Sequence, residues 1–180
     1  QTWLEDAGNE RAVPSDYNLT EHWYLEHIQA PEAWYYLKQN TDPSSYTGSS
    51  SVKVAVIDTG VAYEDYNFST GSDYDRQYYK SPDLDNATFT DPYDAAFDYL
   101  CQYRSLTADP CSAGEWAKVD HANDDQGHGT FVSSVIGATI SDAAPNILLG
   151  IAPSVKIIPI KVSLPVDSAL GLDSGAIYTN

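Results

Sequence analysis

The sequence of 180 residues is poor in basic side chains and contains no long apolar run. Nine Lys and Arg stand against 26 Asp and Glu, which gives a formal net charge of -17 at pH 7. Such a charge repels nucleic acid phosphates and anionic membrane surfaces, so no nucleic acid partner is expected. No apolar stretch approaches the roughly 18 residues that a membrane helix needs. Membrane insertion is therefore not expected either.

Cysteine is also scarce, because only Cys101 and Cys111 occur. No C-x-x-C pair or nearby histidine pair accompanies them, so a zinc site is not indicated. We expect a local disulfide, which forms in oxidising compartments, and two free thiols are the alternative. The sequence begins at Gln1 without a basic and apolar leader. We expect that a signal peptide has been removed or that the natural start lies upstream, and we interpret the protein as secreted.

What the sequence does contain is a series of apolar segments typical of an α/β domain. Residues 1–20 are polar and unperiodic and suggest an extended arm or linker. A short helix is expected from about Pro31 to Asn40. Residues 52–57 are apolar on both faces, as in a buried parallel strand. A helix over 129–141 and a second strand over 155–162 then predict a mostly parallel sheet with right-handed crossovers.

The pattern also makes predictions about a helix face, a long loop and a proline within a strand. The helix over 129–141 should pack through the face that carries Val132, Val135 and Ile136. Residues 63–123 are dense in Asp, Tyr, Pro and Asn and predict a long irregular excursion. Pro159 lies inside the second strand, although proline cannot donate to a sheet ladder and therefore disfavours a central position.

Two short motifs carry groups that are capable of chemistry. Residues 54–60 place the carboxylate of Asp58 at the end of the first strand, and residues 125–130 place the imidazole of His128 at the start of the second helix. Ligands bind at the carboxyl ends of the strands in an open α/β sheet, so the two side chains can converge there. The glycines beside them allow the turn after the strand and keep the backbone uncrowded.

In this order, the two motifs resemble the catalytic Asp and His segments of the subtilisin family. Residues 22–34 are similar to the start of the mature enzyme, and residues 150–162 to the loop and strand after the histidine helix. The resemblance implies a three-layer subtilisin-like α/β domain with a mostly parallel sheet, incomplete in this chain. Residues 14–180 would be the N-terminal part of the peptidase domain. Residues 1–13 would be the tail of an inhibitory prosegment or an N-terminal arm.

The same resemblance implies a serine endopeptidase that acts on proteins or peptides without a catalytic cofactor. His128 would be the general base that takes the serine proton, and Asp58 would orient the imidazole and stabilise its charged form. No Gly-Thr-Ser-like segment occurs before Asn180. We therefore expect the chain to supply two residues of an Asp/His/Ser triad and to be inactive by itself.

A structural calcium ion is also implied by the resemblance. Residues 81–84, Ser-Pro-Asp-Leu, are similar to a family segment whose aspartate binds calcium, which makes Asp83 the metal-binding candidate. The chain departs from the family pattern at Phe131, where a second histidine often stands, and at Ser133 and Ser134, where Ala-Gly is usual.

Two alternatives stay open at this point. Asp58-Thr59-Gly60 is also the signature of aspartic proteases, in which two carboxylates share a proton. Such an enzyme needs a second motif or a homodimer in an all-β fold, and the α/β order disfavours it. The other alternative is a non-catalytic calcium-binding or protein-binding fragment of a degenerate protease.

Overall fold

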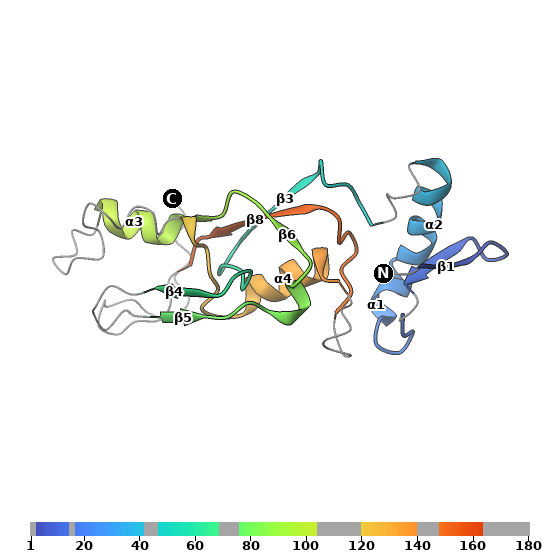
Figure 1. The fold of residues 1–180 in the computed structure, drawn as a ribbon, viewed down its shortest axis with the longest axis horizontal. Coiled ribbons are helices and arrows are strands. Elements are labelled where there is room, and N and C mark those ends of the chain that lie inside the picture. The colour runs from blue at the N-terminus through green and yellow to red at the C-terminus, as the bar shows by residue number, and fades with distance from the viewer. Residues whose placement is uncertain are drawn as a thin grey trace.

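The computed structural model describes residues 3–14, 17–41, 47–68, 76–103, 120–139 and 148–163. Figure 1 shows a parallel sheet with a helix along its face, and a smaller group of strands and helices at one end. In this described part of the chain, no helix is long and apolar enough to cross a membrane.

The parallel sheet is built around strand β8 (Lys156–Lys161). Along its whole length β8 pairs with β3 (Lys53–Asp58), with Asp58 opposite Lys161 at the end of the ladder. On its other side β8 pairs with two short strands, β6 (Thr88–Phe89) and β7 (Tyr93–Asp94), which are also parallel to it. The predicted α/β class and parallel sheet are thereby confirmed.

Pro159 lies in the interior of this sheet, contrary to the expectation from its sequence. Successive residues of a parallel strand direct their backbone groups alternately to the two neighbouring strands. The N–H of Lys156 donates to Val52 on the β3 side, whereas the carbonyl of Ile157 accepts from Thr90 on the β6 side. By this alternation Pro159 faces the same side as Ile157. Its nitrogen then points to the break between β6 and β7, where the sheet requires no backbone hydrogen bond from residue 159.

Helix α4 (His128–Gly137) packs against this sheet, but through a different face from the predicted one. Its buried residues are small: Gly129, Ser133, Ser134 and Gly137. By contrast, Val135 is exposed. The reason is the closeness of the packing, since a methyl group added at Gly137 would lie 3.0 Å from the side chain of Ile157 on β8.

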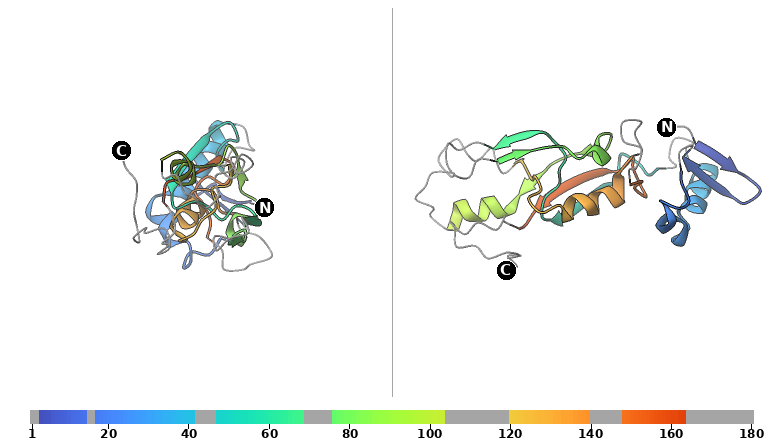
Figure 2. Two further views of the ribbon diagram at one scale, coloured as in Figure 1. Left: turned by 90° about the vertical axis from the view of Figure 1, so that its left-hand side faces the viewer. Right: turned by 90° about the horizontal axis from the view of Figure 1, so that it is seen from below.

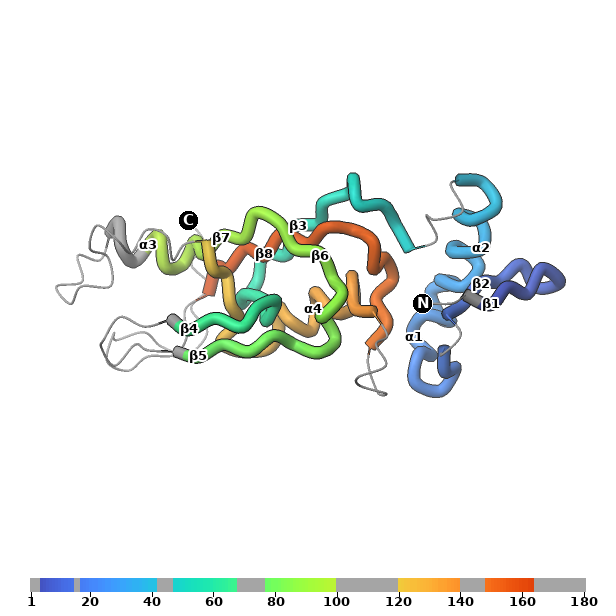
Figure 3. Tube along the Cα trace, in the orientation of Figure 1, coloured from blue at the N-terminus to red at the C-terminus, as the bar shows by residue number. Residues whose placement is uncertain are grey.

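The excursion over residues 63–123 contains more regular structure than predicted. Strands β4 (Tyr66–Phe68) and β5 (Arg76–Tyr78) pair antiparallel, and a 3₁₀ turn, η1, covers Pro82–Leu84. Figure 3 follows the chain from there through β6 and β7 into helix α3, Ala95–Tyr103. Strands of two or three residues are too short to show a period in the sequence. Cys101 belongs to α3, but Cys111 lies outside the described residues, so the predicted bridge between them stays a prediction.

Residues 3–14 and 17–41 form a compact group, whereas the sequence suggested an extended arm over residues 1–20. Strands β1 (Trp3–Asp6) and β2 (Arg11–Pro14) make an antiparallel hairpin, followed by helices α1 (Trp23–His27) and α2 (Ala30–Asn40). Helix α2 confirms the predicted helix, and the hairpin packs beside it (Figure 2). We call these four elements the N-terminal unit. The predicted boundary between residues 13 and 14 falls inside β2 and stays a prediction.

A distant segment completes the core of the N-terminal unit. Leu149 packs with Ala12, Leu25, Ala30 and Trp34 in one buried cluster. The hydroxyl of Tyr24 donates to the carbonyl of Leu149 at 2.9 Å, and the indole nitrogen of Trp34 donates to the carbonyl of Ile151 at 2.9 Å. The N-terminal unit is therefore joined to the segment that leads into β8.

Candidate active site

The two residues predicted to be catalytic meet where β3 ends and α4 begins. Asp58 is the last residue of β3, and His128 is the first residue of α4. The imidazole Nδ1 of His128 lies 2.8 Å from Oδ1 and 2.9 Å from Oδ2 of Asp58. Although 70 positions separate them in the sequence, the parallel crossover from β3 through α4 to β8 brings both side chains to one end of the sheet.

The two side chains differ in their exposure to solvent. The side chain of Asp58 is 17% exposed, whereas that of His128 is 68% exposed. The backbone N–H of Thr59 donates to Oδ1 of Asp58 at 2.7 Å and helps to fix the carboxylate. Because Nδ1 of His128 is held by Asp58, Nε2 is the ring nitrogen left to exchange a proton with another molecule.

Asp58 also changes the proton affinity of the imidazole. Its hydrogen bond with Nδ1 and its negative charge raise the pKa of His128 above the ordinary value. The arrangement of a base within hydrogen-bond reach of an orienting carboxylate is the one that nucleophilic catalysis requires. Chemically, the pair can accept a proton at Nε2 and stabilise the resulting imidazolium.

Glycines let the strand end and the helix start approach each other closely. A methyl group at Gly129 would lie 2.1 Å from the carbonyl oxygen of Gly60 and 3.1 Å from Cβ of Asp58. Gly60 has φ of +107°, and a methyl group there would meet the carbonyl of Asn123 at 2.4 Å. A larger residue at Gly129 would push α4 away from the end of β3, and one at Gly60 would push away the segment that leads into α4.

A further carboxylate, Asp124, binds both of the elements that carry the pair. It accepts hydrogen bonds from the hydroxyl of Thr59 at 2.8 Å and from the backbone N–H of Thr130 at 2.9 Å. The two sequence motifs indicate catalytic candidates at Asp58 and His128 but assign no such role to Asp124. Asp124 stands three residues ahead of the N-cap residue Gly127, so it is not at the N-cap position where an Asp is a recognised sequence signal.

The structure places Asp83, the predicted calcium ligand, in η1, apart from Asp58 and His128. Burial raises the pKa of Asp83, and its backbone carbonyl accepts from the N–H of Thr139 at 3.3 Å. Within the described ranges, no group of three or more His, Cys, Asp and Glu side chains is placed to hold a metal ion. Asp83 offers a half-buried carboxylate, and calcium takes six to eight oxygens, which can also come from backbone carbonyls and water.

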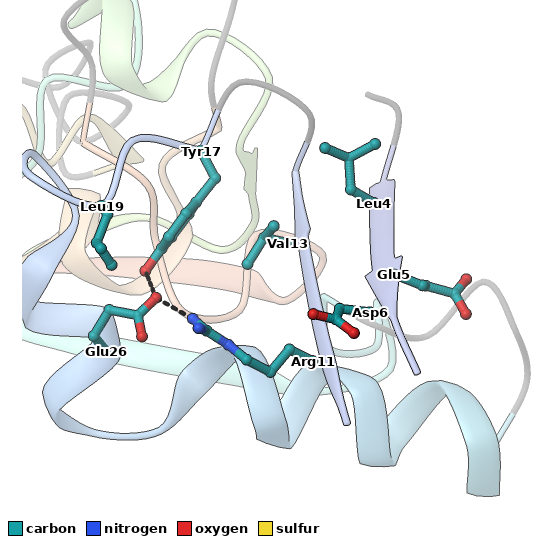
Figure 4. Close-up of a pocket in the computed structure, with 8 residues that line it drawn as sticks. All are labelled: Leu4, Glu5, Asp6, Arg11, Val13, Tyr17, Leu19 and Glu26. Atoms are coloured by element: carbon teal, nitrogen blue, oxygen red, sulfur yellow. Dashed lines mark hydrogen bonds and ion pairs between the residues drawn. The ribbon is translucent and has the colours of Figure 1, made fainter. Parts of the chain in front are cut away.

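A separate cavity of about 310 Å³ lies in the N-terminal unit (Figure 4). Glu26 lies at its wall, where it binds Arg11 and accepts a hydrogen bond from the hydroxyl of Tyr17 at 2.8 Å. None of Asp58, His128 and Asp83 lines this cavity. The Asp58–His128 pair and the cavity therefore belong to different parts of the molecule.

Comparison with protein-family models matches residues 49–180 to the subtilase family. This span contains β3 with Asp58, α4 with His128, and β8. No curated protein and no solved structure matched the chain. The family match covers most of the chain and agrees with the parallel sheet and with the order of the two motifs along it. The chain belongs to the subtilase family of serine peptidases.

Proposed function

We propose that the chain supplies the general base and its orienting carboxylate to a serine endopeptidase. The observation that carries the proposal is the hydrogen bond of 2.8 Å between Nδ1 of His128 and Asp58. In the reaction, Nε2 of His128 takes the proton of a serine hydroxyl while the serine oxygen bonds to the peptide carbonyl carbon. The same nitrogen then gives the proton to the leaving amine as the C–N bond breaks. Asp58 stabilises the imidazolium throughout.

The nucleophile has to come from outside these 180 residues, because they contain no Gly-Thr-Ser-like segment. We therefore propose that the chain alone does not hydrolyse peptide bonds, and that its parent protein does. Proteins and peptides are the substrates, since the subtilase family consists of peptidases. An inhibitory prosegment and secretion belong to the same proposal.

The surroundings of Asp58 argue against an aspartic protease. That mechanism needs a second carboxylate that shares a proton with the first. In the described structure Asp58 instead binds an imidazole and a backbone N–H, at the end of a parallel strand. The Asp-Thr-Gly sequence is thus explained by the turn after β3, where Gly60 has a positive φ.

The decisive experiment measures peptidase activity of the parent protein in which single residues are replaced. We expect His128→Ala and Asp58→Asn each to lower kcat/KM by about 10⁴-fold, as for other triads of this kind. His27→Ala is the matched control, because His27 is an exposed histidine of α1, in the N-terminal unit. Full activity in the His128→Ala protein would overturn the proposal. A parent protein without peptidase activity would favour the non-catalytic alternative.

We also propose that Asp83 contributes to a structural calcium site. A carboxylate whose pKa is raised by burial gains from a nearby cation, which supports the proposal. Millimolar calcium should then raise the Tm of the native chain but not that of Asp83→Asn. Asp85→Asn, which changes an exposed carboxylate two residues away, is the control. An equal rise of Tm in all three proteins would place the ion elsewhere.

A further inference from the structure

We infer that Asp124 is a positioning residue for the catalytic base, because its carboxylate joins the start of α4 to the end of β3 and thereby holds His128 against Asp58. The inference rests on the proposed function for its effect on catalysis. Asp124 itself does not contact Asp58 or His128 through any hydrogen bond of the structure. It acts through their immediate neighbours, Thr59 and Gly129.

On the helix side, Asp124 binds backbone N–H groups of the turn before α4 and of its first turn. The first N–H groups of a helix have no acceptor within the helix. Oδ1 of Asp124 accepts from the N–H of Gln126 and of Gly127, each at 2.9 Å, and Oδ2 accepts from the N–H of Thr130 at 2.9 Å. The residue at the N-cap position, Gly127, has no side chain to do this. Asp124 therefore fixes the turn in which His128 stands.

On the strand side, Asp124 acts through Thr59, which directly follows Asp58. The hydroxyl of Thr59 donates to Oδ1 of Asp124 at 2.8 Å and accepts from the N–H of Gly129 at 2.9 Å. One hydroxyl thus links the residue after Asp58 with the residue after His128. Asp124 thus reaches Thr59 through one hydrogen bond and Gly129 through two. Thr59 and Gly129 are in turn joined by one peptide bond each to Asp58 and His128.

A third link leads to the loop after β3. The hydroxyl of Thr130 donates to Oδ2 of Asp124 and accepts from the N–H of Ala62 at 3.0 Å. This loop also holds Gly60, whose carbonyl lies against Gly129. The helix start and the strand end are therefore tied on both sides of the catalytic pair, with Asp124 as the common acceptor.

The network requires Asp124 to be ionised, because all five groups that it binds are donors. Burial opposes ionisation, but the hydrogen bonds from Thr130, Gln126 and Gly127 outweigh it and hold the pKa of Asp124 below its ordinary value. Asp124 is thus negative over the whole range in which His128 titrates. Its charge adds to that of Asp58 in favouring the protonated imidazole.

The test compares Asp124→Ala, Asp124→Asn and the control Asp120→Asn in the 180-residue chain and in the parent protein. Asp120 is an exposed aspartate four residues upstream. NMR titration of the His128 ring is the first readout, because it does not depend on activity. We expect the pKa of His128 to fall and its Nδ1–H signal to broaden in Asp124→Ala. Asp124→Asn, which keeps one acceptor oxygen, should restore part of both, and Asp120→Asn should change neither.

In the parent protein, we expect Asp124→Ala to lower kcat by roughly 10²-fold with little change in KM, the size of effect that a misplaced catalytic group produces. If Asp124→Ala does not fold, Asp124→Asn carries the same test with a smaller expected loss. A folded variant with unchanged His128 titration and unchanged kcat would overturn the inference and leave Asp124 as a helix cap only. If the titration changes but the native parent protein lacks peptidase activity, the positioning role stands and the proposed function fails.

Discussion

Asp58 and His128 form a coupled pair in which a half-buried carboxylate controls the protonation of an exposed imidazole. The pKa of His128 is raised in the folded state by the bond with Asp58. A raised pKa means that the pair contributes its full stabilisation below the unfolded value of about 6.5 and loses it as pH rises through the folded pKa. The pair therefore stabilises the fold most in mildly acidic solution.

Replacing Asp58 by Asn should lower the pKa of His128 towards its ordinary value, because the neutral amide removes both the charge and one acceptor oxygen. The measurement is an NMR titration of the His128 ring in the native and Asp58→Asn chains. The signals of His27, an exposed histidine of α1, serve as the internal reference. An unchanged His128 titration would mean that the two side chains do not interact in solution.

At the residue scale, short sequence motifs predicted the two candidate catalytic residues. They did not predict the residue that holds this pair in place through a hydrogen-bond network. Asp58 and His128 could be named because each stands in a characteristic sequence at the edge of an apolar segment. Asp124 could not, because its importance comes from five donors supplied by four residues that only the fold brings around it. The role of a hydrogen-bond acceptor of this kind is not visible in sequence order.

At the scale of the elements, the order of strands and helices followed from the sequence, whereas their faces and short members did not. The period of apolar residues in α4 indicated Val135 as buried, yet the helix packs through Gly129, Ser133 and Gly137. Close packing selects small residues, which a hydrophobic pattern counts as neutral. Pro159 disfavours a central strand by its sequence, and the break between β6 and β7 removes that conflict.

Trp34 links the N-terminal unit to the segment before β8. Trp34→Phe removes the indole N–H that binds the carbonyl of Ile151 and leaves a space in the buried cluster. We expect it to lower the free energy of unfolding by about 1–3 kcal/mol, the usual cost of leaving a buried polar group unpaired. Urea unfolding of the variant and the native chain measures this.

Trp23→Phe is the matched control for that measurement. Trp23 is 59% exposed, and an exposed substitution of this kind usually changes stability by no more than about 0.5 kcal/mol. Equal stability of the two variants would show that the Trp34–Ile151 contact does not hold the N-terminal unit in place.

At the scale of the whole molecule, the fold carries a large excess of negative charge. Most of the described basic side chains are already paired with carboxylates, among them Lys53 with Asp91 at 2.7 Å and Lys161 with Asp125. The net charge of -17 is therefore spread over carboxylates that repel one another. The composition predicted this excess, but it did not show that a buried lysine, Lys161, would be among the few cations.

Salt should therefore stabilise the folded chain, because it screens repulsion between exposed carboxylates. We expect the Tm to rise by a few degrees between low and physiological ionic strength, as about 1 kcal/mol of relief would produce. Calorimetry in sodium chloride with a chelator present measures the effect without contributions from bound divalent ions. A flat or falling Tm would mean that attractive ion pairs dominate the surface.

The position of Leu149 in the core of the N-terminal unit has a consequence for the order in which the chain acquires its structure during synthesis. The strands and helices up to Asn40 leave the ribosome more than a hundred residues before the side chain that fills their interior. Nascent chains of intermediate length thus present the uncovered faces of Leu25 and Trp34 to their surroundings. Until the segment before β8 emerges, we expect chaperones to bind these exposed apolar side chains.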